Sequence, residues 1–170
     1  QADIREDFQL APEMYNRLGN KETLAKAQAE FNKGVDVALA GLNQRIGNGK
    51  ISPSDVPLSR LIANSLAKNG NLDGARAVIS DVAVLLTEAG QLGQAARILR
   101  NADPISVEIT IQKAIDKINA ELEMRGSKYR VALTAEEIDM IQSTDFSQEG
   151  AYELVYSEIA RRIGAEMPST

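Results

Sequence analysis

Residues 69–96 read NGNLDGARAVISDVAVLLTEAGQLGQAA, and a glycine followed two residues later by leucine occurs near both ends of this stretch. The pattern of Gly70 and Leu72 recurs twenty residues later as Gly90 and Leu92. A glycine just past a helix adopts the left-handed conformation that ends it, and the leucine that follows can pack back on the last turn. The pattern therefore predicts two corners between helices, with one helix between them over about residues 72–89.

The predicted helix over residues 72–89 is apolar over a broad arc, which indicates a central position between neighbouring helices. The residues of this arc are Ala75, Val78, Ile79, Val82, Leu85 and Leu86. This helix is the second helix of one hairpin and the first of the next. We therefore predict an all-α fold in which about seven or eight consecutive antiparallel helices form a bundle.

The composition limits both the core and the chemistry. The chain has 170 residues, of which 4% are aromatic and none is Trp, so its core consists of Ile, Leu, Val and Ala. Cysteine and histidine are both absent, which excludes disulfides, thiolate nucleophiles, Cys/His zinc sites and a histidine general base. The net charge of -5 argues against nucleic-acid binding through overall charge. No signal peptide or transmembrane segment is visible, so we expect a soluble protein.

The N-terminal part of the chain contains helical patterns of different clarity. Residues 1–18 are irregular and are expected to form an arm or linker, with a short helix starting at Pro12. Apolar residues then recur at helical spacing over residues 20–34 and again over residues 35–47. Because Gly34 separates the two patterns, the sequence predicts two consecutive short helices.

Residues 47–50, Gly-Asn-Gly-Lys, invite comparison with a phosphate-binding loop. The Walker A pattern requires a glycine and a hydroxyl residue where this chain has Gln44 and Ile51, and it also requires a preceding strand. We therefore interpret Asn48-Gly49 as a turn between helices, since both residue types enter left-handed conformations at low cost.

Two further helices are predicted on either side of the central one. Ser54 or Asp55 is expected to cap the earlier helix, whose apolar side is Leu58, Leu61, Ile62, Leu66 and Ala67. Asp103-Pro104 is a start signal for the later one. Residues 105–111 alternate as in a strand, whereas residues 111–122 follow a helical period. We predict one long helix to about Arg125, with its first two turns left open.

The C-terminal part contains a connector and two helices. Residues 129–133 alternate over a stretch too short for a sheet, which predicts an extended connector packed on helices. Thr134 and Glu137 form a capping box that opens a short helix. Ser147 is expected to cap the last helix, with Leu154, Val155, Ile159 and Ile163 on its apolar side.

These patterns divide the chain into three parts. We expect an N-terminal arm over residues 1–18, a helical core over residues 19–126, and a connector with C-terminal helices packed on the core over residues 127–170. The chain begins at Gln1 and ends in Pro-Ser-Thr, so we expect a piece of a longer polypeptide.

Carboxylates are the only catalytic groups that the composition leaves. Glu136, Glu137 and Asp139 cluster in the first turns of a predicted helix, where negative charge complements the helix dipole. Glu121 and Glu123 lie on different sides of their helix. Because a hydrolytic site also needs oriented partners and a cleft, structural roles are favoured. We predict no catalytic residue, no metal site and no cofactor.

Two sets of residues bear on partner binding. The basic residues Arg125, Lys128, Arg130, Arg161 and Arg162 are interpreted as a solvated face, with nucleic-acid contact as the alternative. The tyrosines Tyr15, Tyr129, Tyr152 and Tyr156 could anchor a protein partner, although packing within the chain is favoured in so aromatic-poor a sequence.

Several phrases occur in a distinctive order: Asn20-Lys-Glu-Thr-Leu, Thr87-Glu-Ala-Gly-Gln with Ala96-Arg-Ile-Leu, Ile115-Asp-Lys-Ile-Asn, and Leu133-Thr-Ala-Glu-Glu-Ile-Asp. Over about residues 20–170 the chain resembles a helical segment of the large polyvalent proteins of phages and integrative elements. Those proteins also carry DNA methylase, Swi/Snf-type helicase, protease or phage-head modules. A weaker tetratricopeptide-like similarity covers residues 59–101, but such repeats recur at about 34 residues, not 20.

The resemblance implies no catalytic motif for this segment. We expect a noncatalytic helical spacer or protein-interaction module of a larger mobile-element or phage protein in the bacterial cytoplasm. Its partner would be another domain of the parent protein or a separate protein, with no membrane and no small-molecule substrate. The alternatives are a virion-associated structural or DNA-delivery component, and a nucleic-acid-associated accessory domain.

Overall fold

The computed structural model describes residues 21–167. All regular structure in that range is helical, with seven helices and no strand, so the predicted all-α fold is confirmed. The chain divides into two compact units, Gln1–Gly41 and Leu42–Thr170, each of which is considered by itself. The predicted arm and its short helix at Pro12 lie outside the described residues.

Helix α2 runs without interruption from Lys21 to Gly47. The predicted break at Gly34 is wrong, because this glycine does not adopt a positive φ. A glycine inside a helix costs about 1 kcal/mol relative to alanine, which is too little to end a long helix. Leu24 and Phe31, from the predicted apolar side, are 46% and 52% exposed. The turn predicted at Asn48-Gly49 is confirmed directly after α2.

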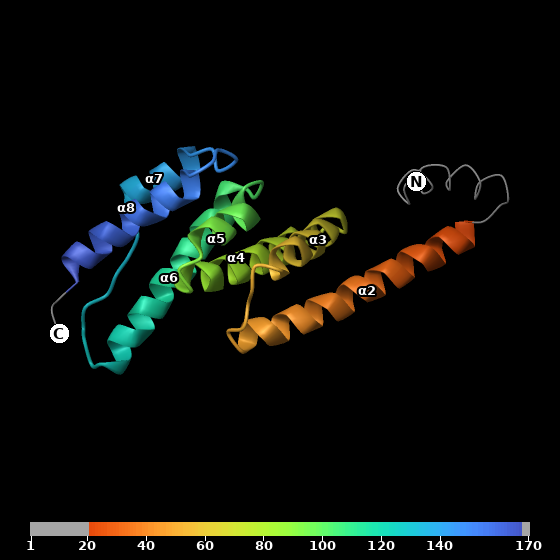
Figure 1. Cartoon of the computed structure of the whole chain (residues 1–170), viewed down its shortest axis with the longest axis horizontal. Coiled ribbons are helices and arrows are strands. Elements are labelled where there is room, and N and C mark those ends of the chain that lie inside the picture. The colour runs from red at the N-terminus through yellow and green to blue at the C-terminus, as the bar shows by residue number, and fades with distance from the viewer. Residues whose placement is uncertain (1–20, 168–170) are drawn as a thin grey trace. The chain divides into compact units, whose positions relative to one another are not determined.

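The second unit is built around α4. Figure 1 shows the four helices of its first half, which are α3 (Asp55–Lys68), α4 (Leu72–Glu88), α5 (Leu92–Leu99) and α6 (Pro104–Met124). Helix α4 packs against the other three, and Val82 and Ala83 in its middle have no exposed surface. The prediction that α4 is central is therefore confirmed.

Both glycines end their helices as predicted, although Leu72 after the first of them is 48% exposed. Gly70 has a φ of 84°, its N–H donates to the Ala67 carbonyl at 3.1 Å, and the Asn71 N–H donates to the Leu66 carbonyl at 2.8 Å. These two bonds satisfy carbonyls that the helix end would leave unpaired, as in a Schellman motif. Gly90, with a φ of 79°, closes α4 through an equivalent pair of 3.1 and 2.9 Å. The corners turn α3, α4 and α5 back on one another.

The start of α6 decides the question left open for residues 105–111, which are helical. The Asp103 side chain accepts from the Ser106 N–H at 2.9 Å, and Pro104 occupies the first turn. Val107 and Ile111 are buried, so the alternating isoleucines and valine fit a half-buried helix. The local cap outweighs the strand-like alternation.

The predicted connector lies between α6 and α7, and one side chain of α6 holds it. The Asn119 carboxamide accepts from the Val131 N–H at 2.7 Å and donates to the Val131 carbonyl at 2.9 Å. Val131 itself is buried. Asn119 thus pairs with an extended residue as a neighbouring strand would.

The last two helices are α7 (Ala135–Ser143) and α8 (Ala151–Glu166). The capping box of Thr134 and Glu137 is confirmed. The prediction that Ser147 caps the last helix is wrong, because α8 begins after Gly150. The Ser147 N–H and hydroxyl both donate to the Asp145 carboxylate, at 3.0 and 2.6 Å, in a turn of their own.

Several burial predictions are wrong, including that for Ala67 of α3, which is exposed. Leu61 of α3 and Leu154 of α8 are 55% and 67% exposed. In their place α3 buries Ser59, whose hydroxyl donates to the Asp55 carbonyl at 2.6 Å, and α8 buries Tyr152. An apolar period cannot detect a buried serine or tyrosine whose hydroxyl has found a partner.

The start of α3 also differs from the predicted hydroxyl cap. Ser54 stands at the N-cap position but makes no side-chain cap hydrogen bond. Asp55 is buried and instead pairs with Arg45 at 2.8 Å and accepts from the Ser52 N–H at 3.1 Å.

Over residues 21–167, none of the helices combines the length and apolar character needed to cross a bilayer.

Candidate functional site

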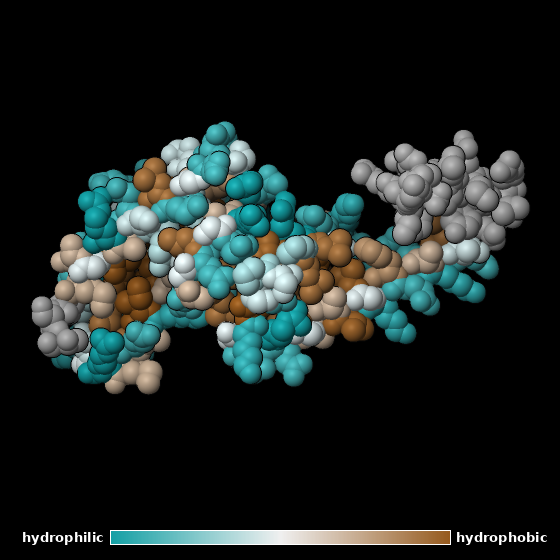
Figure 2. Space-filling view, viewed as in Figure 1, coloured by the Kyte–Doolittle hydropathy of each residue, from teal (hydrophilic) through white to brown (hydrophobic). Residues whose placement is uncertain are grey.

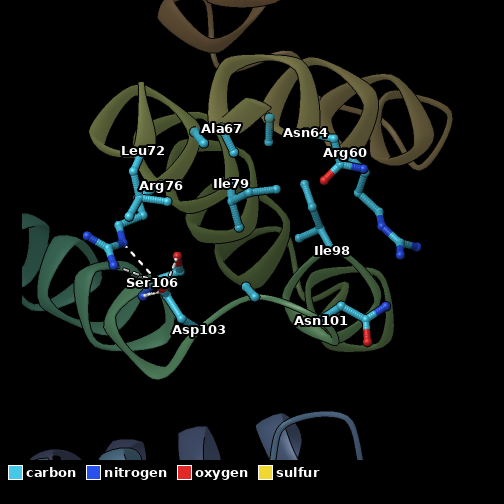
Figure 3. A pocket seen from close by; sticks show the side chains of 13 residues that line it. Arg60, Asn64, Ala67, Leu72, Arg76, Ile79, Ile98, Asn101, Asp103 and Ser106 are labelled. Atoms are coloured by element: carbon cyan, nitrogen blue, oxygen red, sulfur yellow. Dashed lines mark hydrogen bonds and ion pairs between the residues drawn. The ribbon is translucent and has the colours of Figure 1, made fainter. Parts of the chain in front are cut away.

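Helices α3, α4 and α5 and the start of α6 enclose an open pocket of about 380 Å³, called here the α3–α6 groove. Figure 3 shows it from close by, with side chains from all four helices. Its volume is at the small end of the range for ligand sites in proteins. Three parts of the groove differ in chemistry: a floor, an ion-paired end and a polar rim.

The floor is apolar and made of small or branched side chains. Ala63, Ala75, Ile79 and Ile98 line it, and all four are buried. Their helices belong to the packed core, so the floor is held by the same contacts that stabilise the unit. The small side chains of Ala63 and Ala75 leave room for the main chain of a ligand to approach the floor closely.

One end of the groove is closed by an ion pair. The Asp103 carboxylate accepts from Nε and Nη2 of Arg76 at 2.9 and 2.8 Å and from the N–H and hydroxyl of Ser106, both at 2.9 Å. Burial would raise the pKa of Asp103, but the hydrogen bonds from Arg76 and Ser106 and the charge of Arg76 outweigh it and hold that pKa below its usual value. The carboxylate is thus ionised and fully engaged within the fold.

The rim carries polar side chains that the fold does not use. Arg60, Asn64 and Asn101 line the groove and are exposed. Among the described residues, none of the three side chains has a hydrogen-bond or ion-pair partner. Figure 3 shows Arg60 and Asn64 on α3 facing the side of the groove where Asn101 follows α5. The rim therefore offers one guanidinium and two carboxamides to a ligand.

These rim residues were not predicted from the sequence. Arg60 and Asn64 stand four residues apart, which places them on one face of α3, but that spacing is common on any polar helix face. Asn101 joins them only through the corner between α5 and α6. No local signal identifies residues that meet across a groove.

The predicted basic residues are largely paired with acidic neighbours. Arg162 contacts Glu137 and Glu166, and Arg161 pairs with Glu158 at 2.8 Å. Arg125 lies 3.9 Å from Glu121, and Arg130 donates to the backbone carbonyls of residues 127 and 129 at 2.7 Å. Lys128 is exposed. Such pairing between neighbouring charges is typical of a solvated helix face.

The predicted tyrosines separate into different environments. Tyr152 is buried, and its hydroxyl bonds to the Thr87 hydroxyl at 2.8 Å, so it cannot anchor a partner. Tyr156 stacks on it at a ring-centre distance of 6.0 Å. Tyr129 is half-buried at the start of the connector, and Tyr15 lies outside the described residues.

The predicted carboxylates take structural positions. Glu137 completes the capping box, and although burial would raise its pKa, hydrogen bonds from Arg162 and the Thr134 N–H lower it overall. Glu136 and Asp139 are exposed on α7, as are Glu121 and Glu123 on α6. Within residues 21–167, no three acidic side chains come together in a way that could hold a metal ion.

A second hollow of about 190 Å³ lies between α6 and α8. Ile115, Ile118, Ile159 and Ile163 are among its lining residues. Figure 2 shows hydrophobic side chains gathered where these two helices come together. Tyr156 carries the one polar group among its lining residues, so this hollow lacks the guanidinium and carboxamides that give the α3–α6 groove a chemical preference.

Comparison of the chain with protein-family models, with curated proteins and with solved structures finds no match. The chemistry of the α3–α6 groove is therefore the basis on which a function is proposed.

Proposed function

We propose that this chain is a noncatalytic helical module that binds a protein segment in the α3–α6 groove. The observation that carries the proposal is the combination of a buried apolar floor with three rim side chains that have no partner within the described residues. Protein interfaces combine an apolar centre with a polar rim in the same way.

The construction of the groove supports this function. Its lining residues are carried by packed helices and their corners rather than by long loops. A rigid site loses little conformational freedom on binding, which favours recognition of a flexible segment. The absence of histidine and cysteine from the chain favours a binding role over catalysis by a thiolate or an imidazole.

The resemblance to polyvalent proteins suggests the setting. In that setting the module would dock or space the enzymatic domains of a larger phage or mobile-element protein inside a bacterium. The bound segment would belong to another domain of that polypeptide or to a separate protein.

A pair of matched substitutions tests the proposal. Ala67 is exposed and lines the groove, so Ala67→Trp fills it without entering the core. Ala77 is exposed on α4 away from the groove, so Ala77→Trp adds the same side chain elsewhere. Binding of the module to purified domains of its parent polypeptide is then measured by calorimetry.

We expect Ala67→Trp to weaken binding at least tenfold and Ala77→Trp to leave it unchanged. Equal effects of the two substitutions would place the partner elsewhere on the surface. Failure to bind any parent domain, together with turnover of a substrate by the isolated module, would refute the function.

A further inference from the structure

We infer that the segment bound in the α3–α6 groove is an extended acidic peptide, in which a Glu or Asp side chain pairs with Arg60. Asn64 and Asn101 would hold its backbone, and a neighbouring small aliphatic side chain would lie on the floor. This inference rests on the proposed function and names the chemistry of its ligand.

The charges of the groove favour a negative ligand. Its charged lining residues are Arg60, Arg76 and Asp103, two positive and one negative, which leaves a net charge of +1 in a chain whose total is -5. Arg76 pairs with Asp103 at 2.8 Å and also lies 3.9 Å from the Asp73 carboxylate, so its charge is compensated. Arg60 therefore carries the uncompensated charge, and its planar guanidinium matches a carboxylate through two parallel hydrogen bonds.

The two rim carboxamides suit an extended backbone, and this chain already contains such a contact. Asn119 holds Val131 by donating to its carbonyl and accepting from its N–H, at 2.9 and 2.7 Å. A carboxamide offers the same donor and acceptor to any extended residue. Asn64 and Asn101 are free to do so, which favours a peptide over a compact anion such as phosphate.

The floor limits the side chains that the peptide can carry there. Ile79 and Ile98 are 8% and 2% exposed, and together with Ala63 and Ala75 they form an apolar floor. A Val or Ala side chain contacts this floor without burying a polar group. An acidic residue beside a small aliphatic residue is therefore the preferred pattern.

Fluorescence anisotropy with three labelled peptides tests the inference on the full chain. The first repeats Ala-Glu-Val and has both ends blocked, so that its only carboxylates are on side chains. The second replaces every Glu with Gln, and the third is the Gln peptide with a free C-terminal carboxylate. Arg60→Ala, Asn64→Ala and Ala67→Trp are compared with Arg97→Ala, which removes an exposed arginine of α5 outside the groove.

We expect the Glu peptide to bind about tenfold more tightly than the Gln peptide, as one charged hydrogen-bonded pair at a rim provides. Arg60→Ala removes that preference, whereas Arg97→Ala keeps it. Asn64→Ala weakens both blocked peptides by the same factor, because it acts on the backbone. Added salt weakens only the Glu peptide.

Other outcomes overturn the inference in distinguishable ways. Equal affinity for the two blocked peptides, abolished by Ala67→Trp, leaves the groove as a peptide site without acidic preference. Tight binding of the third peptide alone assigns the carboxylate to a chain end. If neither blocked peptide binds while a parent domain still binds in a manner sensitive to Ala67→Trp, the acidic peptide is wrong and the proposed function stands.

Discussion

The hydroxyl pair of Thr87 and Tyr152 joins helices that are far apart in the sequence, and its removal should measurably destabilise the second unit. The two oxygens lie 2.8 Å apart, and the residues are only 5% and 2% exposed. Tyr152→Phe keeps the ring on its neighbour Tyr156 but leaves the Thr87 hydroxyl buried without this partner. A buried unpaired hydroxyl costs roughly 1–3 kcal/mol, and we expect about 1.5 kcal/mol here.

A double-mutant cycle separates this hydrogen bond from packing. Thr87→Val leaves the Tyr152 hydroxyl unpaired and should cost about as much as Tyr152→Phe. The double variant replaces both partners by apolar groups of similar shape, so its loss of stability should be smaller than the sum by about 1 kcal/mol. Urea unfolding followed by circular dichroism measures all four proteins. A strictly additive double variant, or an unchanged stability of Tyr152→Phe, would refute the reasoning.

The same residue predicts a loss of stability in alkali. Burial, the largest cause, raises the pKa of Tyr152 above its usual value of 10.0 despite the Thr87 hydrogen bond. The folded-state pKa exceeds the unfolded one. The stability that protonated Tyr152 contributes is therefore complete below pH 10.0 and is lost as the pH rises above it. Tyr152→Phe should make the decline less steep. Burial also raises the pKa of Tyr156, so part of the decline should remain.

Three further predictions concern a corner, the connector and the capping box. Gly90→Ala should destabilise the unit by about 1–2 kcal/mol, because a φ of 79° strains any side chain. Gly93→Ala, inside α5 with open space around it, should stabilise the unit by about 0.5 kcal/mol. Thermal unfolding that shows the reverse order would contradict the role of Gly90 in ending α4. Asn119→Ala removes two hydrogen bonds from the connector and should speed protease cleavage within residues 127–133 without unfolding α6. Unchanged cleavage would show that the hydrogen bonds between Asn119 and Val131 do not hold the connector in place. Because the pKa of Glu137 is lowered in the folded state, the stability that its carboxylate contributes is present above the unfolded-state pKa and is lost as the pH falls through the folded one. Glu137→Gln should therefore make the loss of stability in acid less steep. An unchanged acid dependence would contradict this role of Glu137.

The α3–α6 groove could not be predicted from the sequence, because its rim residues come from separate segments of the chain. Arg60 and Asn64 belong to one helix and Asn101 to the corner after another, and each is an ordinary polar residue where it stands. Only the turns at Gly70 and Gly90 bring those segments around α4. The sequence shows that the rim residues are polar, but only the packing of the helices brings them together around one groove.

Contacts within a few residues were determined by the sequence alone. The glycine corners, the Asp103 cap and the Thr134 capping box each depend on hydrogen bonds between close neighbours, so their residue types suffice to predict them. The buried face of each helix depends on partners distant in the chain. Ser59 and Tyr152 are buried while Leu61 and Leu154 are exposed, because the neighbouring helices, rather than the apolar period, decide which side is covered and which hydroxyls find partners.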